Sequence, residues 1–330
     1  MRKYWLAILQ GILSLALIWH LFSNPTLRVE AAKVIAHAEP HWLVIGFMTA
    51  ILTESFCAVR WWLILRLFGT PVSLPRVFAF CGAGLFFSLG LPGAAGGDAF
   101  RILYVIRLYP RCKLRASLTV LADRLCGLVA LVVAFAVVAT CHHRLFEGDP
   151  HTKAILAAAS MTLGSVVVLV ILWAVMSTWR PAKRIWLPLE PMRKFGDRLG
   201  LVFPKLASDP KLLASAILVS FPSLACHFTT YFCSMKAFNL QVRISDAFTV
   251  MPIVDTLILL PVTLFGIGLR ETLFEQLLGG LFGVPYGAAT LASLGGFGLQ
   301  AAVAMLGGLM IPFTTPTPIH SSWNNKSKTA

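Results

Sequence analysis

Two short stretches of the chain combine an arginine with glycines in a way that fits an anion-binding site. The first contains Gly96, Gly97, Asp98 and Arg101, and its arginine lies nine residues after Pro92. Glycines at the start of a helix let free N–H groups approach an anion, and the helix dipole favours negative charge there. An arginine one turn further on can grip a phosphate through two parallel N–H bonds. The structural alternative is that Asp98 caps the helix and pairs with Arg101.

A second stretch repeats the pattern in the C-terminal third of the chain, with Gly266, Gly268, Arg270 and Glu271. Its arginine again lies nine residues after a proline. Adjacent residues of a helix point in different directions, so Glu271 is not expected to be the main partner of Arg270. We expect a third group, with Asp255 as the candidate. The two arginines together predict two places where a lipid phosphate is held.

Five further charged residues lie within apolar stretches: Glu54, Arg60, Asp123, Arg124 and Asp255. Charged groups are costly in lipid and usually face a partner or a cavity. Glu54 lies near the middle of its apolar run, so we expect it to face the protein interior as a proton-linked carboxylate or a counter-ion to an arginine. Arg60 lies nearer an end, where its side chain has the alternative of reaching the head groups beside two tryptophans.

Motifs of catalysis and cofactor binding are not found in the sequence. There is no nucleophile elbow, no HExxH, no phosphate-binding loop and no carboxylate pair at catalytic spacing. The seven cysteines form no CxxC pair, which predicts neither a metal site nor a disulfide framework. His227 stands alone in an apolar run and is expected to be a hydrogen-bonded core residue. We therefore expect no catalytic residue, no metal and no cofactor.

The composition predicts an all-α, polytopic integral membrane protein. The chain is 57% hydrophobic and 13% charged, whereas a soluble domain has about 25% charged residues. A membrane-crossing helix needs about 20 apolar residues. On this basis we place six full spans, at about 5–22, 41–66, 116–140, 154–178, 211–235 and 286–313. The first begins after Met1-Arg2-Lys3, and we interpret it as an uncleaved span rather than a signal peptide.

Two more apolar stretches, about 75–91 and 246–268, are interrupted by glycine and proline. Broken backbone at membrane depth occurs only where protein or water surrounds it. We therefore expect two re-entrant hairpins, each followed by a short helix, at about 98–108 and 269–280. Three full spans separate the hairpins, so they enter from opposite faces. This arrangement is typical of an inverted-repeat transporter with its site where the repeats meet.

The distribution of lysine and arginine predicts the orientation. Most of the 28 basic residues fall inside the cell when both termini are cytosolic, with 179–210 inside and 141–153 and 236–245 outside. The net charge of +14 is then explained by contact with anionic lipid, and no nucleic acid is needed. The basic, amphipathic stretch 191–206 is expected to lie on the membrane surface, with a solvated linker as the alternative.

The chain resembles the lysylphosphatidylglycerol synthase transmembrane-region family over about residues 5–313. The likeness rests on three motifs in the family's order: LPGAAGGDAFR at 91–101, ADRL at 122–125 and FGIGLRE at 265–271. The stretch VRWW at 59–62 also resembles the family's second span. One departure is Asp123, where many relatives have glutamate. The resemblance implies a flippase-like domain of bacterial inner membranes with two opposed re-entrant hairpins, and a stand-alone member without a soluble synthase domain.

These observations favour a single flippase-like domain over 1–330, with repeats at about 41–140 and 211–313. Its expected function is to move a phosphate-bearing phospholipid or glycolipid across the bacterial inner membrane. The expected partners are membrane lipids, and further a second copy of the chain or lipid-synthesis enzymes. One alternative is an accessory protein of lipid, hopanoid or envelope-glycan synthesis that transports nothing. The other is a membrane-embedded transferase, which needs Glu54, Asp98 or Asp255 as its acid.

Overall fold

The computed structural model describes residues 36–70, 72–90, 95–110, 113–142, 148–178, 202–260 and 266–314. Three of the expectations above lie outside these residues. They are the span at 5–22, the proline-containing residues 91–94 and 261–265 at or near the ends of the expected hairpins, and most of the basic loop.

The described residues are helical and contain no strand. Five helical segments are long and apolar enough to cross a membrane, which confirms the five predicted spans within the described part. In chain order the helices are α3 (Pro40–Leu67), α4 (Leu74–Gly90), α5 (Ala95–Leu108), α6 (Lys113–Cys141), α7 (Pro150–Thr178), α9 (Val202–Ala207), α10 (Pro210–Ala237), α11 (Ile244–Ile258), α12 (Leu269–Phe282) and α13 (Tyr286–Gly307), which continues as the 3-10 helix η5 (Gly308–Thr314).

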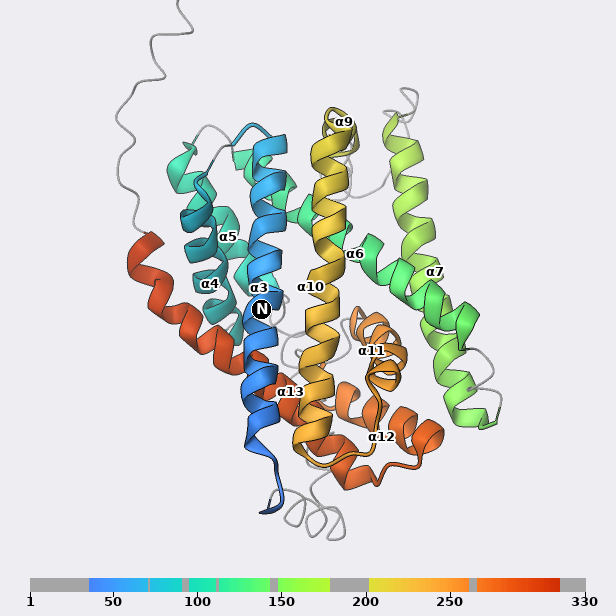
Figure 1. Ribbon diagram of the computed structural model, residues 1–330. Coiled ribbons are helices and arrows are strands. Elements are labelled where there is room, and N and C mark those ends of the chain that lie inside the picture. The colour runs from blue at the N-terminus through green and yellow to red at the C-terminus, as the bar shows by residue number, and fades with distance from the viewer. Residues whose placement is uncertain are drawn as a thin grey trace, which may run out of the picture.

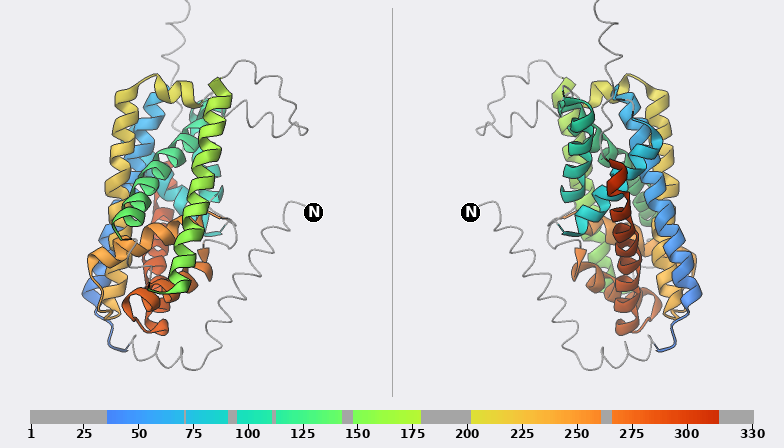
Figure 2. Two further views of the ribbon diagram at one scale, coloured as in Figure 1. Left: turned by 90° about the vertical axis from the view of Figure 1, so that its right-hand side faces the viewer. Right: turned by 90° about the vertical axis from the view of Figure 1, so that its left-hand side faces the viewer.

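Helices α3 and α10 run antiparallel side by side along one face of the molecule (Figures 1 and 2). Polar side chains fix their register. The Cys57 thiol lies 3.2 Å from the Ser223 hydroxyl, and the Arg60 guanidinium donates to the hydroxyl of Ser220. Cys57 is therefore level with Ser223 and Arg60 with Ser220, so that residue numbers rise along α3 as they fall along α10.

Two groups of helices, α3 to α6 and α10 to α13, resemble each other in several of their members. Helices α3 and α10 each have 28 residues and begin with a proline, and α5 and α12 each have 14. The turns after α3 and α10 need a left-handed residue at the same place, which is Gly69 (φ 69°) in one and Asn239 (φ 60°) in the other. Glycine and asparagine are the residues that adopt this conformation most readily. These matches are those expected of an inverted repeat.

The pair α4–α5 and the pair α11–α12 lie toward opposite ends of α3 and α10 (Figure 1). Helices α6 and α13 are inclined to these two helices (Figure 1). The expected hairpin at 75–91 corresponds to α4, and the one at 246–268 contains the shorter helix α11. Helix α11 ends at Ile258, with Leu259 as its C-cap, and is therefore shorter than the apolar stretch that predicted it. The short helices expected after both hairpins are present as α5 and α12, each a little longer than predicted.

Small residues let the inclined helices approach their neighbours closely. A Cβ atom on Gly307 of α13 would lie 2.3 Å from the carbonyl oxygen of Gly82 in α4. A Cβ atom on Gly97 of α5 would lie 2.7 Å from the carbonyl oxygen of Gly84. Close backbone contact of this kind replaces hydrophobic burial as a source of packing energy in lipid. Gly97 thus has a structural role in joining α4 to α5.

Candidate functional site

Arg60 of α3 is a buried charge with several hydrogen-bond partners. Its Nε donates to Asp123 Oδ1 at 2.6 Å and its Nη2 to Asp123 Oδ2 at 3.3 Å. Its Nη1 donates to Ser220, and Nη2 also approaches the sulfur of Cys57 at 3.8 Å. The expectation that Arg60 reaches the head groups is wrong, because a buried carboxylate on α6 holds it within the bundle. The shorter acid at position 123 pairs without difficulty.

Arg101 of α5 lies beside this pair but is bonded much less. Its Nη1 is 3.5 Å from Asp123 Oδ2, and its guanidinium carbon lies 5.5 Å from the ring centre of Trp61. It makes no hydrogen bond to any other described residue. The residue is only 9% exposed. A guanidinium has five N–H donors, so the described residues satisfy Arg101 only in part.

Asp98 pairs with Arg124, and the alternative that it pairs with Arg101 is wrong. Arg124 donates from Nε and Nη2 to the two carboxylate oxygens, each at 3.1 Å. The Arg124 side chain is 55% exposed, whereas that of Asp98 is 21% exposed. The pair joins α5 to α6. Where these helices cross, Arg124 lies closer to Asp98 than Arg101 does, although Arg101 is in the same helix as Asp98.

Arg270 of α12 is the second buried and incompletely bonded arginine. Its Nη1 donates to the hydroxyl of Tyr231 at 2.6 Å, and the guanidinium lies over the ring of Phe297 at 4.7 Å. Its Nε and Nη2 atoms are buried without a hydrogen-bond partner among the described residues. Such a group costs about 1–3 kcal/mol or more, which a bound anion would offset.

Glu271 lies closer to Arg270 than the sequence predicted, with 3.6 Å between Oε1 and the Arg270 Nε. Its main contacts are elsewhere. Glu271 accepts a 2.5 Å hydrogen bond from the backbone N–H of Gly268 and a 3.0 Å hydrogen bond from the Ser293 hydroxyl. The Gly268 amide is therefore already used, and the guanidinium is what remains for an anion. Gly266 and Gly268 adopt positive φ angles of 74° and 87°, which explains the glycines at these positions.

The two arginines occupy equivalent places in the two groups of helices. Arg101 lies over Trp61 of α3, and Arg270 lies 5.8 Å from the ring centre of Tyr231 of α10. Trp61 and Tyr231 are the same number of residues from the start of their helices. From the register of α3 and α10, Trp61 is level with position 219 of α10. Tyr231 is twelve residues further on, or about 18 Å along the axis.

His227 is not alone in the interior. Its Nε2 lies 3.1 Å from Asp255 Oδ2, and its Nδ1 lies 2.8 Å from the amide nitrogen of Gln300. Asp255 was expected to be the partner of Arg270, and its close contact is with His227 instead. It remains within electrostatic range of Arg270. Gln300 carries no charge and stands in an apolar run, so its role was not visible in the sequence.

Glu54 lies between the two groups of charges. Its carboxylate is within electrostatic range of Arg101, His227, Arg124 and Arg60. No hydrogen bond or salt bridge joins it to another residue of the described ranges. The side chain is partly buried, and the register of α3 and α10 places Glu54 level with Cys226 of α10. It thus faces the interior near the middle of the α3–α10 pair.

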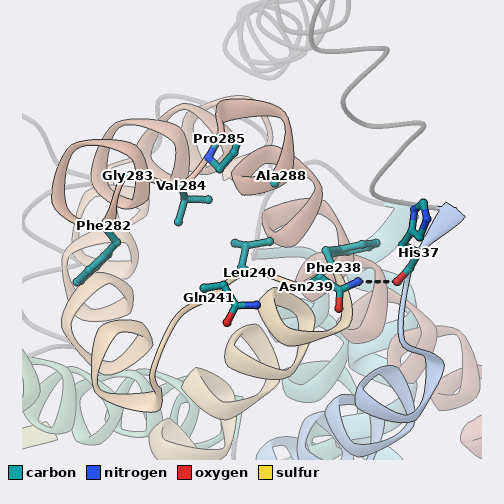
Figure 3. Close-up of a pocket in the computed structure, with 10 residues that line it drawn as sticks. All are labelled: His37, Phe238, Asn239, Leu240, Gln241, Phe282, Gly283, Val284, Pro285 and Ala288. Atoms are coloured by element: carbon teal, nitrogen blue, oxygen red, sulfur yellow. Dashed lines mark hydrogen bonds between the residues drawn. The ribbon is translucent and has the colours of Figure 1, made fainter.

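Two cavities lie away from these charges. One, of about 440 Å³, lies at the end of the molecule where α10 meets α11 and α12 meets α13, and Figure 3 shows its lining. Its polar side chains are those of His37, Asn239 and Gln241, and Asn239 donates to the His37 carbonyl. The other, of about 520 Å³, is lined by apolar side chains of α6, α7, α9 and α10. Neither cavity is lined by one of the arginines of the site.

Comparison with known proteins gives a family and a distant relative. The sequence profile described as "Lysylphosphatidylglycerol synthase TM region" matches residues 7–308. A UPF0104 membrane protein of Methanocaldococcus jannaschii is 29% identical over 93 residues, which are 28% of this chain and 28% of the relative. The match with this relative therefore spans less than a third of its length.

Proposed function

Because the chain belongs to the lysylphosphatidylglycerol synthase TM region family, we propose that this multi-pass membrane protein moves a phosphate-bearing lipid between the leaflets of the bacterial inner membrane. The observation that carries the proposal is the bonding of the arginines. Arg60 and Arg124 are held by carboxylates through hydrogen bonds, whereas Arg101 has only a 3.5 Å polar contact with Asp123 among the described residues, and two buried donor atoms of Arg270 have no partner there. Buried donors without partners are unfavourable unless a ligand uses them.

The positions of Arg101 and Arg270 support two binding places for one head group. They lie on opposite sides of the centre of the α3–α10 pair, about 18 Å apart along it by helix geometry. A phosphodiester would bind to one arginine from each leaflet and pass the partly exposed centre between them. Its acyl chains would stay in the bilayer, and the apolar cavity beside α6 and α7 offers space for one.

The transferase alternative has less support in the geometry. Of the three carboxylates that it requires, Asp98 is held by Arg124 and Asp255 contacts His227. Only Glu54 is without a close partner among the described residues. We therefore propose transport, with no covalent step.

The test is the movement of a fluorescent phospholipid across liposomes that contain the purified protein. The variant with Arg101→Gln and Arg270→Gln should lose at least about tenfold in rate, because each change removes charged hydrogen bonds to the phosphate. Arg124→Gln is the control for the loss of a positive charge, since it removes one arginine from an exposed pair; each single variant, Arg101→Gln and Arg270→Gln, is compared with it. Rates like those of the unchanged protein in the double variant would overturn the two-arginine mechanism.

A further inference from the structure

The charges around Arg101 do not balance without Glu54. Arg60 and Arg101 share the single carboxylate of Asp123. Arg124 and Asp98 neutralise each other. Arg101 lies over Trp61, and Glu54 is two helical turns before Trp61 in α3, within electrostatic range of the Arg101 guanidinium. Glu54 is therefore the carboxylate that can balance the remaining positive charge.

The opposite side of Glu54 faces a group that can hold a proton. His227 is within electrostatic range of Glu54, and the register of α3 and α10 places the two side chains at the same level. The Gln300 amide nitrogen is only a donor, so Nδ1 of His227 accepts and Nε2 carries the hydrogen toward Asp255. Tyr231 packs edge-on against the imidazole, and Arg270 lies behind it. His227 therefore has two carboxylates near it that can accept a proton, those of Glu54 and Asp255, and one hydrogen-bond donor, the Gln300 amide.

We propose that Glu54, with His227 and Asp255, forms a proton-binding site midway between the two arginines, and that Glu54 takes up a proton when a lipid phosphate binds to Arg101. This inference rests on the proposed function. The phosphate brings a second negative charge to a place where Glu54 already balances the cations, and the two anions repel each other. The carboxylate then accepts one proton from water and becomes a neutral acid. When the phosphate leaves Arg101, Glu54 releases that proton and is again the charged carboxylate within electrostatic range of the arginine.

Ionisable groups at the membrane midplane mark proton relays in other membrane proteins. Here Asp255 of α11 lies 3.1 Å from His227 of α10, and the register of α3 and α10 places Glu54 near the level of His227. The side chains of His227 and Asp255 are 20% and 21% exposed, so the proton has a route to the surroundings. Lipid movement would then be coupled to proton movement at a single carboxylate.

The experiment is calorimetric titration of the full-length protein in detergent with dioctanoyl phosphatidylglycerol. The phosphodiester of this lipid does not titrate near neutral pH, so any proton exchanged belongs to the protein. The titration is run at one pH in two buffers that differ in their enthalpy of ionisation. We expect a difference in heat that corresponds to about one proton taken up per lipid.

Two variants separate the proton site from the phosphate site. Glu54→Gln should still bind the lipid but show the same heat in both buffers. Glu39→Gln, the same change at the half-exposed start of α3, should keep the difference. Binding by the unchanged protein with no difference between buffers would overturn the proton site and leave the phosphate site standing.

A failure to bind the lipid would instead count against the proposed function, and a second measurement then decides on Glu54. Dicyclohexylcarbodiimide reacts with protonated carboxyl groups in apolar surroundings. We expect labelling of Glu54, located by peptide mass spectrometry, to increase as the pH is lowered, while Glu39 stays unlabelled. A Glu54 that is not labelled at any pH at which the protein remains folded would overturn the proposal.

Discussion

Nε of Arg60 donates a 2.6 Å hydrogen bond to Oδ1 of Asp123, and this contact joins α3 to α6 inside the bundle. Asp123 is 1% exposed and also lies 3.5 Å from Arg101. One carboxylate therefore holds two guanidinium groups, and the three residues form the charged centre of the first group of helices.

This arrangement predicts unequal costs for removing its members. Asp123→Asn leaves two buried cations without their carboxylate and should destabilise by at least the 3–5 kcal/mol typical of a broken buried pair. Arg60→Gln leaves Asp123 with Arg101 and should cost less. Thermal unfolding in detergent, followed by tryptophan fluorescence, measures both variants. A larger loss for Arg60→Gln than for Asp123→Asn would contradict the shared role of Asp123.

Arg101→Lys should reduce lipid movement although the charge is kept. Lysine cannot present two parallel N–H donors to a phosphate, so we expect a loss of about tenfold in rate. Arg124→Lys, at the exposed pair with Asp98, should have little effect. The liposome assay described above compares the two variants. Equal rates for both would mean that the planar fork at position 101 has no role in transport.

The close contact of α13 with α4 predicts a steric penalty. Gly307→Ala would place its methyl group 2.3 Å from the Gly82 carbonyl oxygen and should cost about 1–3 kcal/mol through forced separation of the helices. Gly298→Ala in the same helix meets no atom within 4 Å and should be neutral or stabilise by up to about 1 kcal/mol. The midpoint of thermal unfolding distinguishes them, and a stable Gly307→Ala variant would show that the contact is looser than described.

The start of α7 should loosen at acid pH. Backbone N–H groups, that of Thr152 above all, bond to the carboxylate of Asp149 and hold its pKa below the ordinary value. A lowered pKa means that the stabilisation is present above the unfolded pKa and is lost as the pH falls through the folded one. Hydrogen exchange of the Thr152 amide should therefore become faster, relative to the intrinsic rate, in strong acid. Asp149→Asn should remove this pH dependence, and its persistence there would assign the effect to another group.

Labelling in intact cells tests the predicted orientation. Lys205 and Gln241 lie beyond opposite ends of α10 and are both exposed. In a variant without native cysteines, a cysteine at position 241 should react with an impermeant reagent, and one at position 205 should react only after the membrane is opened. Native Cys141, exposed at the end of α6, serves as a second position on the outer side. The reverse pattern would invert the topology.

The sequence by itself determined where the long apolar helices lie along the chain and that Arg101 and Arg270 occupy equivalent positions. A run of about 20 apolar residues in lipid must satisfy its backbone internally and therefore forms a helix, so the limits of α3 and α10 could be predicted within a few residues. The nine-residue spacing from proline to Arg101 and to Arg270 also identified equivalent places before any coordinates. These are local properties, which one segment of chain specifies without its neighbours.

Only the tertiary structure decided which charged side chains form ion pairs with each other. Asp98 pairs with Arg124, 26 residues away, and Arg60 with Asp123, 63 residues away. The choice depends on how helices cross, because a shift of one turn brings a different side chain to the contact. The same crossings leave two donor atoms of Arg270 without a partner among the described residues and bring Glu54 level with His227. Partners in a buried network are selected by distances of a few ångströms between helices, and such distances are absent from the order of residues along the chain.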